Sequence, residues 1–426
     1  MQREINELEY LTLAVGQPFN IAVMLKIKGS VELDLLESTF EKLQKKHPLL
    51  RARIIFSEKN IPFFTSEGVE SIPITEIMRI DEMQAMNEFH KQLTTPFDLS
   101  DKNLPLIRVT MFSSPEISEL IICSLHAISD GYSMVFLVRD MLKFLANPNE
   151  PINPIELPGK EVDLLIPKVK KILPKTSFFS RVVYILLRSY NFLRYTFTGK
   201  RKTAEINIKE NEMDIYSTKL TEDQTTDFLA RCKKERVTVH SAISTSFVQE
   251  LPIIGAPVNL RNRLNQDIGE SFGFYSGVAV YKRKYRKSQD FWQNAKSVQR
   301  KLLKGLRDRK LFILQKIFSK KAPLNLLRKI GTYYIEIVTN KKPFSIDNLG
   351  LLDFHLKDIS FEKLPIIESF FGGITSFLDA FIVLFYTLKN EMHFYFHYTK
   401  SKYSREEIEL YAETIKKRLN KAIYET

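Results

Sequence analysis

The residues of this chain whose types and spacing could do chemistry lie within Ile121–Leu142. A histidine, an acid and a glycine, His126, Asp130 and Gly131, stand within six residues of one another. An apolar run ends at His126, and an apolar segment of helical period follows from Met134, which predicts a strand, a loop and a helix. This arrangement would place His126 at the mouth of a sheet edge.

Residue types alone leave three interpretations of these side chains open. In the first, His126 is a structural residue at a strand end and Asp130 caps the following helix. In the second they bind a metal, but none of the other six histidines forms a second ligand motif, so we predict no metal site. In the third, neutral His126 takes the proton from an alcohol or amine as it attacks an activated carbonyl, and Gly131 permits close approach of the substrate.

Length and composition are those of an ordinary globular protein. The chain has 426 residues, 44% of them apolar and 27% charged, which predicts two or three domains and little disorder. Two cysteines, Cys123 and Cys232, provide neither a disulfide framework nor a zinc spacing, so we expect a reducing, cytoplasmic location. The first residues lack the apolar core of a signal peptide. We expect a monomer.

The net charge of +13 is concentrated in two segments. Residues 160–202 carry a net charge of +9 and residues 281–345 one of +16, so the remainder is acidic, with a net charge of −12. These segments could be solvated helix faces, or a surface that attracts a phosphorylated cofactor, an acidic carrier protein or anionic lipid. Nucleic acid is not expected, because no binding motif and no compact aromatic platform accompany the charge.

The order of patterns divides the chain into an N-terminal lobe, 1–151, a proline-rich linker, 152–210, and a C-terminal lobe, 211–426. Each half mixes strands and helices, which predicts an α/β (α+β) fold of two units with a cleft between them. Within the linker, 178–197 is aromatic, basic and compatible with a helix. This segment either covers the protein as a docked helix or lies on a membrane surface as a peripheral contact.

Several individual elements can be predicted for comparison with the structure. Apolar spacing predicts a helix over 33–46, and alternation predicts a strand over 49–55. A basic stretch in the second half predicts two helices, over 288–307 and roughly 311–330. Thr238 is a candidate N-cap.

The segment Leu125–Gly131 resembles the His-x-x-x-Asp-Gly signature of the CoA-dependent acyltransferase superfamily. That superfamily includes alcohol acetyltransferases, polyketide-associated acyltransferases and nonribosomal-peptide condensation domains. Four further segments resemble family regions and occur in the family's order along the chain: Lys46–Ala52, Val237–Ala242, Pro257–Arg261 and Asp347–Gly350.

The resemblance implies two chloramphenicol-acetyltransferase-like lobes around a central active-site tunnel. A donor thioester would enter from one face and the acceptor from the other, with His126 midway as general base and no covalent acyl-enzyme. The resemblance also implies that Asp130 pairs with Arg261 of the second lobe. Such a pair would satisfy a buried carboxylate and hold the loop that carries the base.

The remaining site residues are implied in the same way. Gly131 would let the acyl chain or pantetheine pass, and its N–H could help to stabilise a developing oxyanion. Asn348 and Gly350 could line the tunnel, although a plain turn would explain them equally well. His47 and His240 are interpreted as packing or solvent-exposed histidines.

Two positions depart from the family pattern. Leu125 stands where condensation domains usually carry the first of two histidines, which favours a CoA-using O- or N-acyltransferase. Asn259 replaces the usual acid of the Val-Asp-Leu-Arg segment, away from the expected chemistry.

The expected function is transfer of an acyl group from acyl-CoA, or from a carrier-bound thioester, to a hydroxyl or amine. No cofactor would be bound permanently; acyl-CoA or a phosphopantetheine thioester would be the co-substrate. Partners would be a small-molecule or lipid acceptor and an acyl carrier protein. One alternative is a freestanding condensation-like enzyme fed by a carrier protein. Another is a catalytically inactive scaffold, which would have no need of His126.

Overall fold

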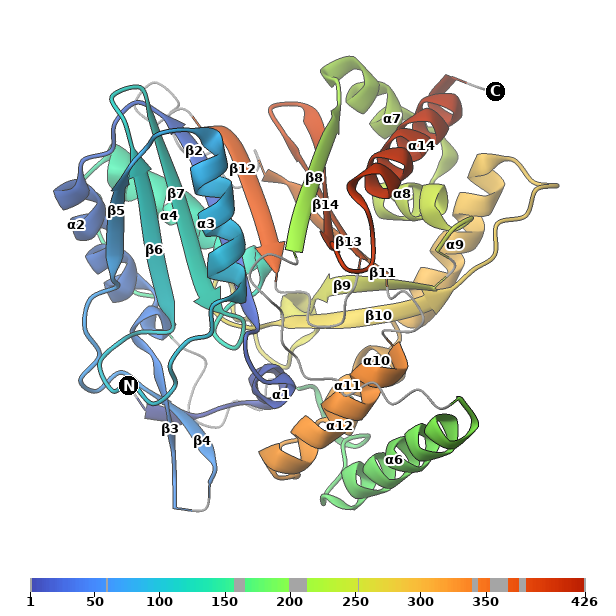
Figure 1. Cartoon of the computed structure of the whole chain (residues 1–426), viewed down its shortest axis with the longest axis horizontal. Helices are drawn as coiled ribbons and strands as arrows, with labels where there is room; N and C mark the ends of the chain where they lie inside the picture. Colours follow the sequence, from blue (N-terminus) through green and yellow to red (C-terminus); the bar gives the residue numbers. More distant parts are fainter. Residues whose placement is uncertain are drawn as a thin grey trace.

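The computed structural model describes residues 2–58, 60–156, 165–198, 213–251, 253–338, 344–352, 367–374 and 381–424. Two β-sheets, each with helices packed on it, form two lobes that lie side by side (Figure 1). The predicted α/β organisation in two lobes is therefore confirmed.

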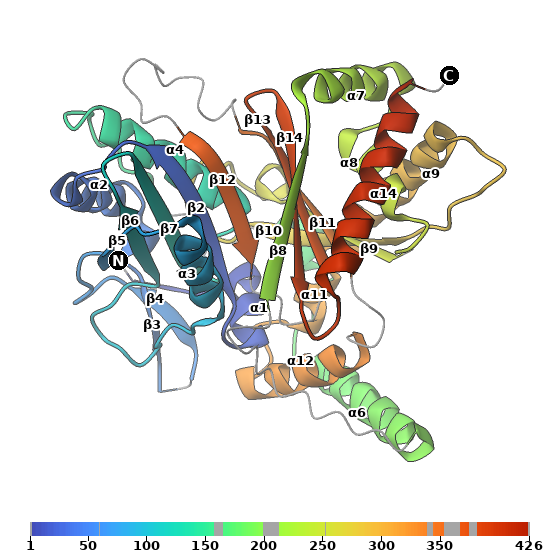
Figure 2. The same cartoon turned by 45° about the horizontal axis from the view of Figure 1, so that its top comes forward.

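The N-terminal lobe is built on a five-stranded sheet in the order β12-β2-β7-β6-β5. Its central strand, β7, is buried from Ser118 to Leu125, because helices cover both faces of the sheet (Figures 1 and 2). The helices of this lobe are α2 (Leu33–Lys46), as predicted, α3 (Glu82–Thr94) and α4 (Gly131–Ala146). The strands are β2 (Asn20–Lys28), β5 (Ile74–Met78), β6 (Ile107–Ser113), β7 (Ile117–Leu125) and β12 (Ile367–Ile374).

A smaller three-stranded sheet, ordered β1-β4-β3, adjoins this lobe next to helix α1 (Glu7–Val15). The predicted strand over 49–55 is wrong in its first half, where Pro48–Arg51 forms a 3₁₀ turn, η1. Proline at the start of the turn has a suitable φ and lacks the N–H that a ladder would need. The strands are β1 (Gln2–Glu4), β3 (Arg53–Phe56) and β4 (Pro62–Thr65).

The C-terminal lobe is built on a six-stranded sheet in the order β10-β9-β11-β13-β14-β8. Its strands are β8 (Met213–Leu220), β9 (Ile253–Asn259), β10 (Ser276–Lys282), β11 (Phe344–Leu351), β13 (Phe381–Leu388) and β14 (Glu391–Thr399). Its helices are α7 (Glu222–Glu235), α8 (Val239–Phe247), α9 (Phe291–Gly305) and α14 (Arg405–Tyr424). Thr238 caps α8 as predicted, since its side chain accepts a hydrogen bond from the Ser241 N–H.

The second half of the chain contributes one strand to the N-terminal sheet. Strand β12, from the last third of the chain, pairs antiparallel with β2 and extends the N-terminal sheet toward the second lobe (Figure 2). The division into 1–151 and 211–426 followed chain position alone and did not anticipate this pairing. The pairing ties the lobes together beside the cleft.

The predicted helix over 311–330 is wrong as one element. The chain forms α10 (Asp308–Leu311) and α11 (Ile313–Ile317), then breaks before Pro323 and starts again as α12 (Leu324–Val338). Proline begins a helix more readily than it continues one, which accounts for the restart.

The linker between the lobes forms α5 (Pro167–Lys170) and α6 (Phe178–Thr198), so the predicted helix over 178–197 is confirmed. Helix α6 packs on α12 at one end of the molecule (Figures 1 and 2). None of the helices in the described part of the chain is long and apolar enough to cross a membrane.

Candidate active site

His126 lies at the end of β7 and between the lobes. Its ring packs edge-on against Phe19 of the N-terminal lobe and Phe274 of the C-terminal lobe, with ring centroids 4.7 and 5.0 Å away. The Nδ1 atom lies 2.7 Å from the carbonyl oxygen of Ser129. Because a carbonyl can only accept, Nδ1 must donate, which leaves Nε2 of the neutral ring with a free lone pair.

Burial keeps His126 neutral. Its side chain is 7% exposed, and desolvation lowers the pKa of the imidazole against smaller raising effects of the Ser129 carbonyl and Asp130. No residue that the structure describes forms a hydrogen bond with Nε2. The ring is therefore held in the protonation state and tautomer that a base requires.

Asp130 is both a helix cap and half of an inter-lobe ion pair. Its Oδ1 accepts a hydrogen bond of 2.8 Å from the Ser133 N–H in the first turn of α4. Its Oδ2 lies 3.0 Å from Arg261 Nη1 and accepts a second bond of 2.9 Å from the Tyr275 N–H. The two interpretations that the sequence set against each other are thus compatible.

Arg261 makes further contacts that bind the second lobe to α4. It belongs to a 3₁₀ turn, η2 (Arg261–Arg263), that follows β9. Its Nη2 donates to Ser133 Oγ at 2.8 Å, and its guanidinium stacks over Tyr275 at 4.7 Å from the ring centroid. Asn259, in place of the family's acid, accepts from the Arg261 N–H at 3.0 Å and so supports the turn.

Gly131 is the first residue of α4 and lies against the second lobe. A Cβ at this position would stand 2.9 Å from Leu349 Cδ2 of β11, so a larger residue would force Leu349 to move. No described residue accepts a hydrogen bond from its N–H. The first turn of the helix thus presents an open donor at the lobe interface.

A cavity of about 260 Å³ opens at this point between the lobes. Asp130, Gly131 and Tyr132 form its N-terminal wall, and Asn348 and Leu349 of β11 stand among the residues of the opposite wall. The rest of the lining comes from the C-terminal lobe: His240, Ala256, Pro257, Val258, Asn259, Ser276, Leu302, Leu306 and Asp347. His126 is not among the lining residues.

The two tunnel candidates have different positions. Asn348 lines the cavity, and its Oδ1 accepts from the Gly350 N–H at 2.8 Å. Gly350 is not among the lining residues; it lies at a register shift between β11 and β13 with φ of +77°. This left-handed conformation explains a glycine there without any contact to a ligand.

Two titratable residues of the cavity were not assigned to the site by the sequence. Asp347 has no cationic partner among the described residues, and desolvation raises its pKa to about 6. His240 also lines the cavity, and burial lowers its pKa to about 4. Asp347 opens the segment Asp347–Gly350, which resembles a family region, and this resemblance was the signal that could have identified it.

His47, by contrast, is a packing residue, one of the two interpretations considered for it. It is fully buried, and its Nε2 lies 2.9 Å from Asp140 Oδ2. Lys46 and Arg139 contact the same carboxylate at 2.8 and 3.1 Å; with His47 they hold the pKa of Asp140 well below its usual range, against the raising effect of burial. This network braces α2 against α4.

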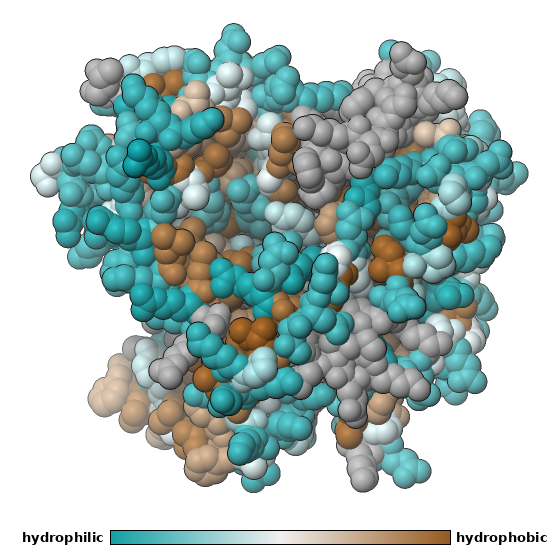
Figure 3. Space-filling view, turned by 180° about the vertical axis from the view of Figure 1, so that it is seen from behind, coloured by the Kyte–Doolittle hydropathy of each residue, from teal (hydrophilic) through white to brown (hydrophobic). Residues whose placement is uncertain are grey.

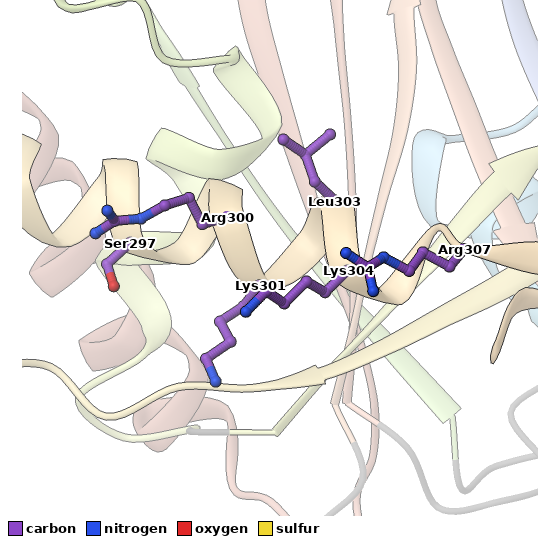
Figure 4. Close-up of a pocket in the computed structure, with 6 residues that line it drawn as sticks. All are labelled: Ser297, Arg300, Lys301, Leu303, Lys304 and Arg307. Atoms are coloured by element: carbon purple, nitrogen blue, oxygen red, sulfur yellow. The ribbon is translucent and has the colours of Figure 1, made fainter.

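A basic groove of about 470 Å³ runs along α9, the helix that also supplies Leu302 and Leu306 to the cavity. Figure 4 shows the side chains of the groove extending from α9 and the turn after it. Four are cationic and exposed, and no carboxylate of the described residues pairs with them: Arg300, Lys301, Lys304 and Arg307. No group of three or more potential metal ligands occurs in the described ranges.

Comparisons with known proteins place this site in context. Residues 13–158 match the family model of the condensation domain. Over 141 residues, 32% of its length, the chain is 28% identical to the hybrid PKS-NRPS synthetase fsa1 of Fusarium sp. (strain FN080326). Over 134 residues it is also 28% identical to the nonribosomal peptide synthetase dtxS1 of Metarhizium robertsii. The chain spans only 4% and 2% of these two relatives.

Solved structures resemble the whole chain. Polyketide synthase associated protein 5 of Mycobacterium tuberculosis aligns with a TM-score of 0.63 at 14% identity, covering 99% of this chain and 98% of that one. The trichothecene 15-O-acetyltransferase TRI3 of Fusarium sporotrichioides aligns with a TM-score of 0.66 at 13% identity, covering 99% and 95%. The first condensation domain of the CDA synthetase aligns with a TM-score of 0.65 at 11% identity, covering 100% and 97%.

The chain therefore shares its two-lobed fold with condensation domains and with an acetyltransferase, and the predicted resemblance is confirmed. The sequence likeness is narrower than the structural one: it covers the N-terminal lobe and has the pattern of a condensation domain. Both classes of neighbour, acetyltransferase and condensation domain, are compatible with a transferase.

Proposed function

We propose that this protein transfers an acyl group from a pantetheine thioester to a hydroxyl or amine acceptor, with His126 as general base. The observation that carries this proposal is the His126 ring, neutral by burial, with Nδ1 committed to the Ser129 carbonyl and Nε2 free. A scaffold without activity would gain nothing from a buried histidine held in one tautomer.

The reaction needs no covalent acyl-enzyme. Nε2 of His126 takes the proton from the acceptor O–H or N–H as the oxygen or nitrogen attacks the thioester carbon. The new C–O or C–N bond forms, the C–S bond breaks, and the proton passes to the departing thiolate. The products are an ester or amide and the free pantetheine thiol, so atoms and charges balance.

The first turn of α4 would support the negative charge that develops on the thioester oxygen. Gly131 lines the cavity, and its N–H has no acceptor among the described residues. Asp130 holds this turn through the Ser133 N–H and the Arg261 guanidinium, so the donor is positioned before the reaction begins. Asp130 and Arg261 are positioning residues in this mechanism, and the central tunnel would run past Gly131.

The basic groove on α9 supports a phosphorylated donor. Four cations that no described carboxylate pairs with lie on α9, the helix that also lines the cavity, and on the turn after it. The pantetheine arm carries phosphate in both CoA and carrier-bound form. Long-range attraction by such a cluster would raise the rate at which the donor associates.

The condensation-like alternative, in which a carrier protein delivers the thioester, has one observation in its favour. The family model that matches residues 13–158 is that of the condensation domain. Leu125 in place of the first histidine of that family's usual pair favours CoA instead. The two donors share the pantetheine phosphate and differ in what lies beyond it.

A thiol-release assay tests the proposal. The full chain is incubated with a series of acyl-CoAs, or with an acylated carrier protein, together with alcohol and amine acceptors; free thiol is measured and products are identified by mass spectrometry. Acceptor-dependent thiol release that His126→Ala removes supports the proposal. Equal release by wild type and His126→Ala would contradict it.

Charge variants in the same assay test whether the basic groove attracts the donor. Arg300→Gln with Lys304→Gln should raise the KM for acyl-CoA about tenfold at low salt and leave kcat unchanged. Lys301 also belongs to the groove, so the control variant must lie elsewhere on the surface. Lys416→Gln with Lys417→Gln, on α14, removes the same charge elsewhere and should leave the KM unchanged.

A further inference from the structure

Helix α6 has one face that the protein covers and one that it does not. On the covered face, Ser180 Oγ donates to the Ile317 carbonyl at 3.0 Å, and Asn191 Nδ2 donates to the Tyr333 carbonyl at 3.2 Å. The rings of Tyr184 and Tyr333 lie 5.8 Å apart. The helix is therefore docked on α11 and α12, which realises the first of the two interpretations of this segment.

The opposite face is apolar and open. Six large apolar side chains on it are between 54% and 84% exposed: Phe178, Ile185, Leu186, Phe192, Leu193 and Phe197. Phe178, Ile185 and Phe192 are spaced by seven residues, two turns of helix, so they share one side. Figure 3 shows the apolar patch that results over α6 at the edge of the molecule. Soluble proteins rarely expose so many large apolar groups together without a partner.

The charged residues of the linker segment that forms and precedes this helix, from Lys168 to Arg194, are all basic. Arg181 and Arg188, also seven residues apart, are exposed beside the apolar side chains, and Lys171 and Lys175 are exposed just before the helix. Exposed cations of the neighbouring α12 region add to them: Lys321, Arg328 and Lys329. The sequence has no Asp or Glu between positions 163 and 205.

From this combination we infer that α6 binds the surface of an anionic membrane, lying in the plane of the interface. An apolar face bordered by basic residues matches acyl chains bordered by anionic headgroups. A second copy of the chain would bring cations against cations, because the segment carries no carboxylate to pair with them. The inference does not depend on the transferase activity.

Flotation with vesicles tests the inference on the full chain. Phosphatidylcholine vesicles are compared with vesicles that contain about one third phosphatidylserine, at low and high salt. We expect the protein to float with the anionic vesicles, to remain unbound with pure phosphatidylcholine, and to be released in part by salt.

Matched variants separate the face from general surface hydrophobicity. Leu186→Ser, Phe192→Ser and Leu193→Ser combined should lower the bound fraction at least about tenfold. Ile80→Ser, Met83→Ser and Leu410→Ser combined remove three equally exposed apolar side chains elsewhere and should leave binding unchanged. Arg181→Gln with Arg188→Gln should weaken binding several-fold and flatten its salt dependence.

Three results would overturn the inference, provided that circular dichroism shows each variant folded. The first is equal flotation of wild type and the serine variant on α6. The second is a concentration-dependent dimer in sedimentation that the same variant loses. The third is binding of a phosphopantetheinylated carrier protein, without vesicles, that the same variant abolishes.

Discussion

The two walls of the inter-lobe cavity each present a carboxylate, and the surroundings of the two carboxylates differ. On the α4 wall, Asp130 accepts hydrogen bonds from two backbone N–H groups and pairs with Arg261. On the β11 wall, Asp347 has no cation beside it among the described residues, and desolvation raises its pKa to about 6. One carboxylate is committed to the architecture, and the other is available to protons or to a ligand.

The comparison shows that two residues of the same type can have different roles when their surroundings differ. Both residues are aspartates at the ends of short motif-like segments, and both line the same cavity. Arg261, from a turn far along the chain, pairs with the carboxylate of Asp130. This pair fixes the loop between β7 and α4, which carries His126. No cation of the described residues lies beside Asp347. Variants at the two walls should therefore fail in different ways.

The largest effect on activity is expected for substitution of His126, at the end of β7. His126→Ala removes the proposed base and should lower kcat/KM about 10³–10⁴-fold, or about 4–5 kcal/mol in transition-state stabilisation, with little change in thermal unfolding. His240→Ala, which removes the other histidine of this region, should cost far less. As the pH falls, wild type should lose its activity with a midpoint at a pH below about 6.5, the ordinary pKa of His. Burial lowers the pKa of His126, and the neutral form that acts as base prevails above that lowered pKa.

The next effect is on stability. Asp130→Ala leaves the buried Arg261 guanidinium without its carboxylate and should lower the free energy of unfolding by about 3 kcal/mol or more. Urea titration followed by circular dichroism measures this. Arg261→Ala should cost a similar amount, and the double variant should cost less than the sum, because the two side chains share one interaction. Additive losses would show that the pair is not coupled.

A smaller effect, dependent on pH, is expected on the β11 wall. The raised pKa means that folded Asp347 holds its proton more tightly than unfolded Asp347, so wild type should lose stability as the pH rises from about 4 to above 6. Asp347→Asn should remove this dependence. At pH 8 the variant should be more stable than wild type by about 1–2 kcal/mol, which is less than the pKa shift alone implies because solvent screens the carboxylate. Urea titrations at pH 5 and pH 8 check this.

The smallest effect concerns the contact between the walls. Gly131→Ala places a methyl group 2.9 Å from Leu349 Cδ2 and should cost about 1–2 kcal/mol of stability. Leu349→Val should recover part of that loss in the double variant, because it shortens the opposing side chain. If Leu349→Val brings no recovery, the strain lies elsewhere in the first turn of α4.

The local features of both walls could be predicted from the sequence to different extents. A strand before His126, a helix after the loop and a cap at Asp130 follow from short-range patterns and are present, although the helix begins at Gly131 and not at Met134. The pairing of Asp130 with Arg261 came from resemblance, not from residue patterns. The places of Asp347 and His240 in the cavity were not predicted, because a single sequence does not show which strands and helices converge.

The sequence by itself determined where most helices and strands lie, since apolar period, caps and prolines act over a few residues. It also determined that α6 is amphipathic and basic, and that His126, Asp130 and Gly131 lie together in one strand–loop–helix segment. Tertiary structure alone decided that β12 joins the first sheet, that Asp347 has no cationic partner in the described part of the chain, and that the apolar face of α6 points outward. These features depend on contacts between residues hundreds of positions apart, whose burial no local pattern can specify.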